Sequence, residues 1–257
     1  MKNTILLLSI MQLKGKSFTI GNYQRGYKWG KKEILELLND IYSYNEHNGI
    51  YCLQPIILKP LSESTDEVDF ENQLYSIFTN NEVIDGQQRS TPLFILLKYL
   101  HHIGLLPQEY LYKIDYQTRV RSGIFLNKNL AAIFDLQMDS ISEEELIEKR
   151  YTDVAAVNSL WESFITANEE FNNVDVYHFF VVSCYIKQWF TLIIQTNEAR
   201  QIFAERLLTK VKIIWYSLDE AKHSQNVIDV FLNNNKGKIS LTTSELIKAL
   251  FILNIKN

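Results

Sequence analysis

The segment Val83-Ile84-Asp85-Gly86-Gln87-Gln88-Arg89 constrains the fold more than any other part of this chain. A short apolar run ends in Asp-Gly, and a polar triplet then leads into an apolar stripe with helical spacing: Leu93, Leu96, Leu97 and Leu100. Gly86 permits a tight turn. Pro92 suits the first turn of a helix, where its missing N–H is not needed. The pattern predicts a strand, a tight turn and a helix.

The rest of the chain divides near residue 103 into a mixed part and a mainly helical part. The first part predicts helices at residues 5–11 and 31–44 and strands at 16–20 and 49–58. An acidic loop at 62–71 and a hairpin of 73–79 with 81–84 follow. The second part predicts strands at 110–116 and 212–218, with helices at 121–134, 142–150, 153–171, 175–195, 198–211, 225–232 and 243–252. We therefore predict an α+β protein, with an α/β core in residues 1–103 and a helical extension in residues 104–257 packed on it.

Composition excludes several classes of protein. A chain of 257 residues with 46% hydrophobic residues can bury a core, so it is neither a disordered tail nor a disulfide scaffold. Cys52 and Cys184 lie far apart in apolar surroundings, which predicts two buried free thiols and a reducing, cytoplasmic location. No run approaches the roughly 20 apolar residues that span a membrane.

The Asp85–Arg89 turn has the chemistry of a phosphate site. Free N–H groups at a helix start attract anions, and the Arg89 guanidinium can bind phosphate oxygens in a bidentate manner. Asp85 could hold Mg²⁺ beside those phosphates, and Gln87 or Gln88 could orient an attacking water. The alternative is an ordinary turn with solvent-facing polar side chains. The GxxxxGK[ST] phosphate loop is absent.

A second segment, Tyr23-Gln24-Arg25-Gly26-Tyr27-Lys28-Trp29, interleaves aromatic rings with cations. Bases can stack on such rings while cations meet phosphates. Six cations and no acidic residue lie between Lys14 and Lys32, although the chain as a whole has a formal net charge of −4. The segment predicts a DNA-binding surface of Tyr23, Gln24, Arg25, Tyr27, Lys28 and Trp29. Alternatively, the aromatic rings pin the loop to the core and Arg25 forms an ion pair.

Together these two motifs resemble those of the DGQQR-motif domain family (domain of unknown function 262). That domain occurs in GmrSD-type modification-dependent restriction enzymes and in the phosphorothioate-sensing protein SspE. Three later pieces match in the same order: Tyr116-Gln117-Thr118-Arg119, the helix at 175–190, and residues 231–250 with Asn235-x-Gly237-Lys238-Ile239-x-Leu241-Thr242. The resemblance spans roughly residues 5–252.

The resemblance implies a ParB/sulfiredoxin-like α/β core followed by helices, and an NTPase that regulates restriction of modified DNA. It implies Mg²⁺ and a nucleoside triphosphate as cofactors. Its catalytic candidates are Asp85, Gln87, Gln88 and Arg89, with Asp85 as metal ligand. Its nucleotide-binding candidates are Asp85, Gly86, Gln88, Arg89, Ser90 and Arg119. The expected partners are DNA, modified or plain, and a nuclease domain or subunit that we expect to be absent from this chain. An oligomer is compatible with the sequence.

Two departures from the family pattern keep other functions open. Gly21-Asn22 stands where the family has Ile-Pro, and Ser90-Thr91-Pro92 replaces Leu-Thr-Thr. Pro92 removes an N–H that could have reached a ligand. The chain could therefore be a DNA- or partner-binding module without catalysis, or a defence component whose activity needs a second chain.

Overall fold

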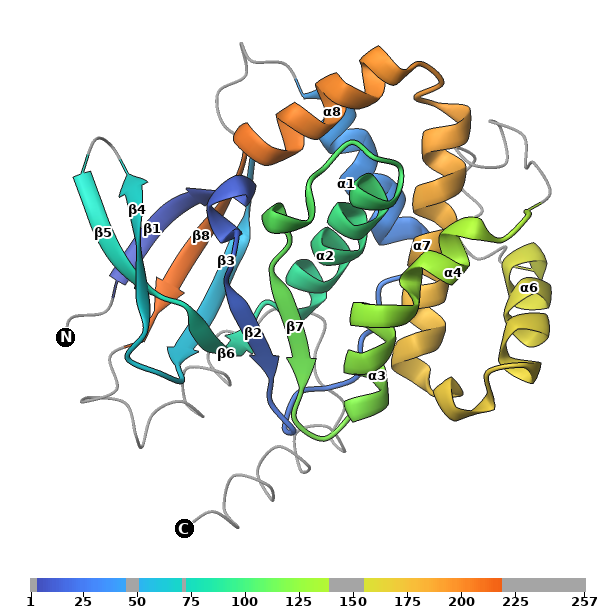
Figure 1. The fold of residues 1–257 in the computed structure, drawn as a ribbon, viewed down its shortest axis with the longest axis horizontal. Coiled ribbons are helices and arrows are strands. Elements are labelled where there is room, and N and C mark those ends of the chain that lie inside the picture. The colour runs from blue at the N-terminus through green and yellow to red at the C-terminus, as the bar shows by residue number, and fades with distance from the viewer. Residues whose placement is uncertain (1–3, 45–50, 71–72, 139–154, 219–257) are drawn as a thin grey trace.

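A mixed six-stranded sheet organises the computed structural model, which describes residues 4–44, 51–70, 73–138 and 155–218. The strand order is β1-β8-β3-β6-β2-β7. Its strands are β1 (Thr4–Ser9), β2 (Ser17–Ile20), β3 (Tyr51–Pro60), β6 (Asn80–Asp85), β7 (Lys113–Tyr116) and β8 (Val211–Ser217). β8 is antiparallel to β1 and parallel to β3, β3 is antiparallel to β6, and β6, β2 and β7 run parallel. The first and last described strands therefore lie side by side (Figure 1).

Helices cover this sheet and pack on one another (Figure 1). They are α1 (Lys31–Ser43), α2 (Gln87–His102), α3 (Val120–Ile124), α4 (Leu130–Asp135), α6 (Ala155–Thr166), α7 (Val174–Leu192) and α8 (Asn197–Thr209). A π-helical turn, Phe125–Asn129, joins α3 to α4. Short 3₁₀ turns occur at Ile10–Leu13, Gln108–Tyr110 and Glu169–Phe171.

The core lies around α2 and α7. α2 contacts β3 and β7 of the sheet and also packs against α4 and α7. Leu93 to Leu97 are all at most 1% exposed, so α2 is apolar around its whole circumference. A helix of this kind is stable only when it is enclosed, which places the Asp85–Arg89 turn at the end of a buried helix.

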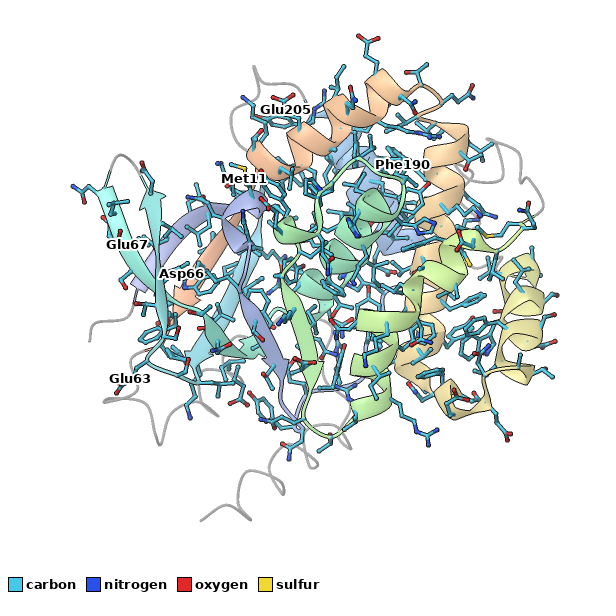
Figure 2. All side chains as sticks on the ribbon, in the orientation of Figure 1. Met11, Glu63, Asp66, Glu67, Phe190 and Glu205 are labelled. Atoms are coloured by element: carbon cyan, nitrogen blue, oxygen red, sulfur yellow. The ribbon has the colours of Figure 1, made fainter. Side chains whose placement is uncertain are left out.

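A separate hairpin of β4 (Thr65–Phe70) and β5 (Gln73–Phe78) lies between β3 and β6 in the chain. Lys16 Nζ, which is buried, forms an ion pair of 2.6 Å with Asp66 on β4. Gln12 Nε2 donates to the Asp69 carbonyl at 2.6 Å. Figure 2 shows Glu63, Asp66 and Glu67 at this margin of the molecule, whereas Phe190 of α7 lies among the helices.

Most predicted elements are confirmed, and the α+β fold class is correct. The strands at 16–20, 49–58, 110–116 and 212–218 and the helices at 31–44, 121–134, 153–171, 175–195 and 198–211 appear with shifted ends. Since β7 and β8 belong to residues 104–257 and yet join the sheet, the division at residue 103 stays a prediction, as does the ParB-like assignment. The expected helices at 142–150, 225–232 and 243–252 lie outside the described residues.

Three predicted elements of the first hundred residues are wrong. Residues 5–11 form β1 and a 3₁₀ turn instead of a helix, because β8, some 200 residues later, supplies a pairing edge. The acidic segment 62–71 contains β4, which is exposed on most positions and is held by its backbone ladder with β5. The hairpin of 73–79 with 81–84 does not form, since β5 pairs with β4 whereas β6 lies between β3 and β2. In the described part of the chain, no helix is long and apolar enough to cross a membrane.

Candidate functional site

The turn between β6 and α2 depends on Gly86. This residue is the N-cap of α2 and has a φ of 117°, in the region that favours glycine. A Cβ atom there would lie 3.0 Å from Ile56 Cγ1 and 3.1 Å from Ile56 Cα on β3. Only glycine therefore allows this turn to approach β3 so closely.

Helix α2 begins immediately at Gln87, earlier than its apolar stripe indicates. The Gly86 carbonyl accepts the N–H groups of Arg89 and Ser90, each at 2.9 Å. The N–H groups of Gln87 and Gln88 precede the first turn, where a helix provides no acceptor of its own. These two amides form an anion-attracting end at the turn.

Two residues of the predicted turn are less available than expected. The Ser90 hydroxyl is buried and donates back to the Gly86 carbonyl at 3.2 Å, so it acts within the helix. Pro92 is the sixth residue of α2, which corrects its expected place in the first turn. Because proline has no backbone N–H, one hydrogen bond is missing from the interior of the helix.

Arg89 is the cation nearest the helix start. Its Nη1 donates to Gln54 Oε1 at 2.9 Å, and its Nη2 donates to the Pro55 carbonyl and lies 3.3 Å from Asp85 Oδ2. Its buried Nε has no hydrogen-bond partner among the described residues. A buried unsatisfied N–H is costly, so this guanidinium retains capacity for an acceptor.

A pocket of about 450 Å³ opens in front of this turn. A cavity of this size is typical of small-molecule and cofactor sites. The start of α2, loop 21–30, β3 and α1 contribute its walls. The lining residues are Gln24, Arg25, Trp29, Glu33, Glu36, Leu37, Asp40, Tyr51, Cys52, Leu53, Gln54, Asp85, Gly86, Gln87, Gln88 and Arg89.

The α1 wall of the pocket is acidic. Glu33 Oε2 accepts the Gly30 N–H at 2.9 Å, and Asp40 Oδ2 accepts the Tyr51 hydroxyl at 3.0 Å. Burial raises the pKa of Tyr51, and the bond to Asp40 adds to this shift. Among the described residues, no three His, Cys, Asp or Glu side chains are grouped as a metal site. A Mg²⁺ ion at Asp85 would complete its coordination with water and with phosphate oxygens of a substrate.

Both cysteines lie in described segments, and the structure corrects one of the two predictions. Cys184 is buried, and burial raises the pKa of its thiol to about 12. Cys52 is exposed and lines the pocket. The apolar residues around Cys52 in the sequence lie on alternating faces of β3, which explains the error.

Loop 21–30 brings the second motif to the same pocket. Tyr23 and Gln24 are each 6% exposed and Tyr27 is fully buried. The Gln24 side chain donates to the Val83 carbonyl on β6. Burial raises the pKa of both Tyr23 and Tyr27. These three side chains hold the loop to the core. For the two tyrosine rings, this is the alternative interpretation given for the segment.

The rest of this loop motif faces outward. Lys28 is exposed, and Arg25 and Trp29 are partly exposed. Arg25 and Trp29 also line the pocket. Of the predicted DNA-binding side chains, these three have the larger exposure, while Gln24 also lines the pocket at 6% exposure.

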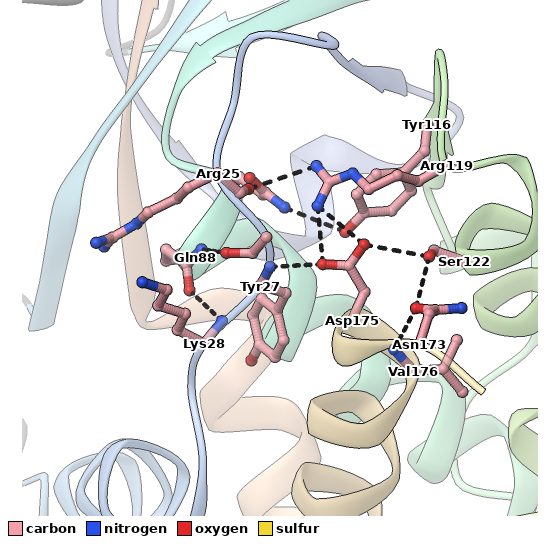
Figure 3. Close-up of polar contacts among 12 residues, drawn as sticks. Arg25, Tyr27, Lys28, Gln88, Tyr116, Arg119, Ser122, Asn173, Asp175 and Val176 are labelled. Carbon is pink, nitrogen blue, oxygen red and sulfur yellow. Dashed lines mark hydrogen bonds and ion pairs between the residues drawn. The ribbon is translucent and has the colours of Figure 1, made fainter. Parts of the chain in front are cut away.

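Asp175 at the start of α7 fixes the loop from its other side (Figure 3). Its Oδ1 accepts the Tyr27 N–H at 2.7 Å, and Arg119 Nη1 lies 2.8 Å from the same oxygen. Arg119 also donates to the Arg25 carbonyl at 3.4 Å, while the Arg25 side chain points away from this network. Arg119 does not line the pocket that contains Arg89. Sequence reasoning gave Asp175 no role, because its partners are distant in the chain.

The two glutamines of the turn point in different directions. The Gln87 side chain is buried and its Nε2 donates to the Tyr116 hydroxyl at 3.4 Å. The Gln88 amide contacts loop 21–30 through both of its polar atoms. The structure thus brings together Asp85, Gly86, Gln87, Gln88 and Arg89 around the pocket.

These features define a class of protein: an α+β domain with a ligand-sized pocket at a strand–glycine–helix turn. The family model described as the GmrSD restriction endonuclease N-terminal domain matches residues 7–252, and the chain belongs to this family. It is thus related to a component of a DNA restriction system, which confirms the GmrSD part of the resemblance. No curated protein matches the sequence.

Proposed function

We propose that this domain binds a nucleoside triphosphate with Mg²⁺ in the pocket and hydrolyses it to regulate restriction of modified DNA. The observation that carries the proposal is the buried, unpartnered Arg89 Nε in the first turn of α2, beside the pocket. A cationic donor beside the backbone N–H groups of a helix N-terminus is suited to phosphate oxygens.

The rest of the pocket has room and chemistry for a nucleoside. Trp29 and Tyr51 offer aromatic faces, and the α1 wall offers carboxylate acceptors for the N–H groups of a base. Asp85 would share Mg²⁺ with the phosphates. When bound, the ion would neutralise charge on the phosphoryl group. Arg89 would stabilise the charge that develops on that group during transfer.

The modified-DNA role rests on loop 21–30 and on the family. Arg25 and Lys28 extend from a loop that is anchored on both sides, so their charges are presented from a fixed backbone. Binding through such cations weakens steeply as salt rises. A gel-shift titration of plain and modified duplexes over a range of salt concentrations tests this part, and no shift at low salt for any duplex contradicts it.

Alkylation of Cys52 tests nucleotide binding without relying on turnover. Cys52 lines the pocket, whereas Cys184 is buried and serves as an internal control in the same chain. We expect Mg²⁺ with one of ATP, GTP, CTP or UTP to slow maleimide labelling of Cys52, measured by mass spectrometry. Unchanged labelling with all four nucleotides contradicts the proposal.

Replacement of Arg89 by Ala should remove most of this protection. Arg89 supplies the charged donor at the phosphate end, and a hydrogen bond to a charged group contributes about 1.5–3 kcal/mol, so affinity should fall roughly tenfold or more. Arg121→Ala is the matched control. Arg121 is exposed on α3, donates to the Glu170 carbonyl and does not line the pocket. Equal protection in both variants contradicts the role of Arg89.

A binding module without catalysis is the second candidate. It is favoured by Ser90, Gln87 and Gln88, whose side chains make hydrogen bonds within the protein and so have fewer polar groups to offer an attacking water. Phosphate release by the same preparation separates the two candidates. Protection of Cys52 with no release, with or without DNA, supports the binding module.

A further inference from the structure

The side chain of Gln88 joins the pocket to loop 21–30. Its Oε1 accepts the Lys28 N–H at 3.0 Å, and its Nε2 donates to the Gly26 carbonyl at 3.1 Å. One amide group thus satisfies two backbone groups of the loop, as a neighbouring strand would (Figure 3). The same residue is the second of α2 and lines the pocket.

The loop has little freedom to move independently of this contact. On its far side, the Tyr27 N–H is held by Asp175, which is 3% exposed. A Cβ atom on Gly26 would lie 3.1 Å from Asp175 Oδ1, so the backbone is pressed against that carboxylate. Gln88 and Asp175 thus both hold the same three residues, 26–28, from opposite sides. A change in the position of Gln88 must therefore be taken up by these residues.

We propose that Gln88 is a positioning residue that transmits occupation of the pocket to the loop that carries Arg25 and Lys28. This inference rests on the proposed nucleotide site. Phosphates on the N–H groups of Gln87 and Gln88 fix the first turn of α2, and the Gln88 amide then fixes the backbone at Gly26 and Lys28. By linkage, a ligand that orders the loop strengthens nucleotide binding by the same factor. Because both polar atoms of its amide bind the loop, Gln88 acts by holding the loop.

Amide hydrogen exchange of the full chain measures this transmission directly. The Lys28 N–H reports the Gln88 contact and the Tyr27 N–H reports the Asp175 contact. The ligand is Mg²⁺ with whichever of the four nucleotides best protects Cys52 from alkylation. We expect it to slow exchange in the peptide containing residues 26–28 by at least about fivefold, which corresponds to the lower end of measured coupling between sites.

Gln88→Met keeps the length of the side chain and removes both hydrogen bonds. We expect faster exchange of residues 26–28 in the unliganded variant and loss of the nucleotide-dependent slowing. Gln117→Met is the matched control. Gln117 Oε1 accepts the Asn22 N–H of the same loop at 3.4 Å and lies outside the pocket, so slowing should persist. Loss of slowing in both variants indicates a general loosening and overturns the assignment to Gln88.

The outcomes distinguish this inference from the proposed function. Protection of Cys52 with unchanged or faster exchange at residues 26–28 overturns the inference and leaves the nucleotide site standing. Absence of protection by any nucleotide overturns both. Slowing that survives in Gln88→Met overturns the role of Gln88, even when wild-type protein shows the coupling.

Discussion

At the scale of single residues, Gly86 determines the geometry of the pocket. It combines a φ of 117° with a distance of only 3.1 Å between Ile56 Cα and a Cβ atom added to the glycine. Gly104, which follows α2, has a φ of 77°, and a Cβ atom added there would meet nothing within 4 Å. A side chain at Gly104 would meet only backbone strain, whereas one at Gly86 would meet backbone strain and a steric clash.

Gly86→Ala should destabilise the protein by about 1–3 kcal/mol, because strain at such backbone angles adds to crowding against β3. Gly104→Ala should cost only about 1 kcal/mol, the backbone term alone. Urea unfolding of the two variants measures the difference. Equal loss in both would show that β3 moves away at little cost.

His178, which contacts loop 21–30, makes the stability of the protein depend on pH. Its Nδ1 lies 3.1 Å from the Trp29 carbonyl, which can only accept. Burial lowers its pKa below the usual 6.5. The Trp29 contact and the charges of Asp175 and Glu33 oppose this shift, and Lys28 adds to it. The unfolded chain binds the proton more readily than the folded protein does, so stability falls as pH drops below about 6.5.

We expect His178→Gln to remove this dependence. The difference in unfolding free energy between wild type and variant should be constant above pH 7. As pH falls from about 6.5 to the lower pKa of folded His178, wild type should lose stability relative to the variant. Urea midpoints at pH 7.5 and 5.5 measure it, and the carboxylates common to both proteins cancel. A difference that is constant over this range contradicts the lowered pKa.

At the scale of elements, the hairpin of β4 and β5 is attached through a buried cation. Lys16 is 1% exposed and precedes β2, whereas the Asp66 side chain is 51% exposed. A buried ammonium without its partner is costly, and such a pair is screened less by salt than an exposed one. The acidic segment therefore has a structural contact that its solvated composition conceals.

Asp66→Ala should reduce stability by about 2 kcal/mol, less than for a fully buried pair because water reaches the carboxylate. Glu67→Ala is the control, since Glu67 is the next residue on β4 and its side chain is exposed. It should change stability by less than about 0.5 kcal/mol. Urea unfolding at low and high salt measures both, and similar small losses would contradict a structural role for the Lys16 pair.

At the scale of the whole molecule, β8 closes the sheet. It lies between β1 and β3, so two strands from the start of the chain are joined by one that follows about 150 residues later. β7 likewise completes the other edge beside β2. Since sheet edges left unpaired expose backbone groups and apolar surface, the N-terminal segment depends on the later strands.

Residues 1–103 expressed alone should therefore lack a cooperative unfolding transition. The same segment co-expressed with residues 104–257 should recover it, because β7 and β8 are then available. Circular dichroism during urea titration measures both samples. A cooperative transition in the isolated segment would contradict this expectation and support an independent domain ending near residue 103.

The local sequence pattern was sufficient to predict the elements whose formation depends on nearby residues. The apolar spacing of residues 31–44 predicted α1, and the β-branched and aromatic run at 212–218 predicted β8, since each signal lies within its own segment. β1 and β4 were missed because their patterns are short and their stability comes from pairing. For the site, the Asp-Gly turn was readable because glycine at a strand–helix junction has a specific conformational use. The roles of Ser90, Arg119 and Asp175 depend on neighbours that the pattern does not reveal.

The sequence by itself determined an α+β chain with a phosphate-suited turn and a basic, aromatic loop, because residue type and spacing act over a few neighbours. Only the tertiary structure decided that this turn and this loop share one pocket, and that Gln88 connects them. It also decided that Tyr23 and Tyr27 are anchors and that Arg119 pairs with Asp175. Contacts between distant segments arise from the packing of β8, α2 and α7, for which no local pattern carries information.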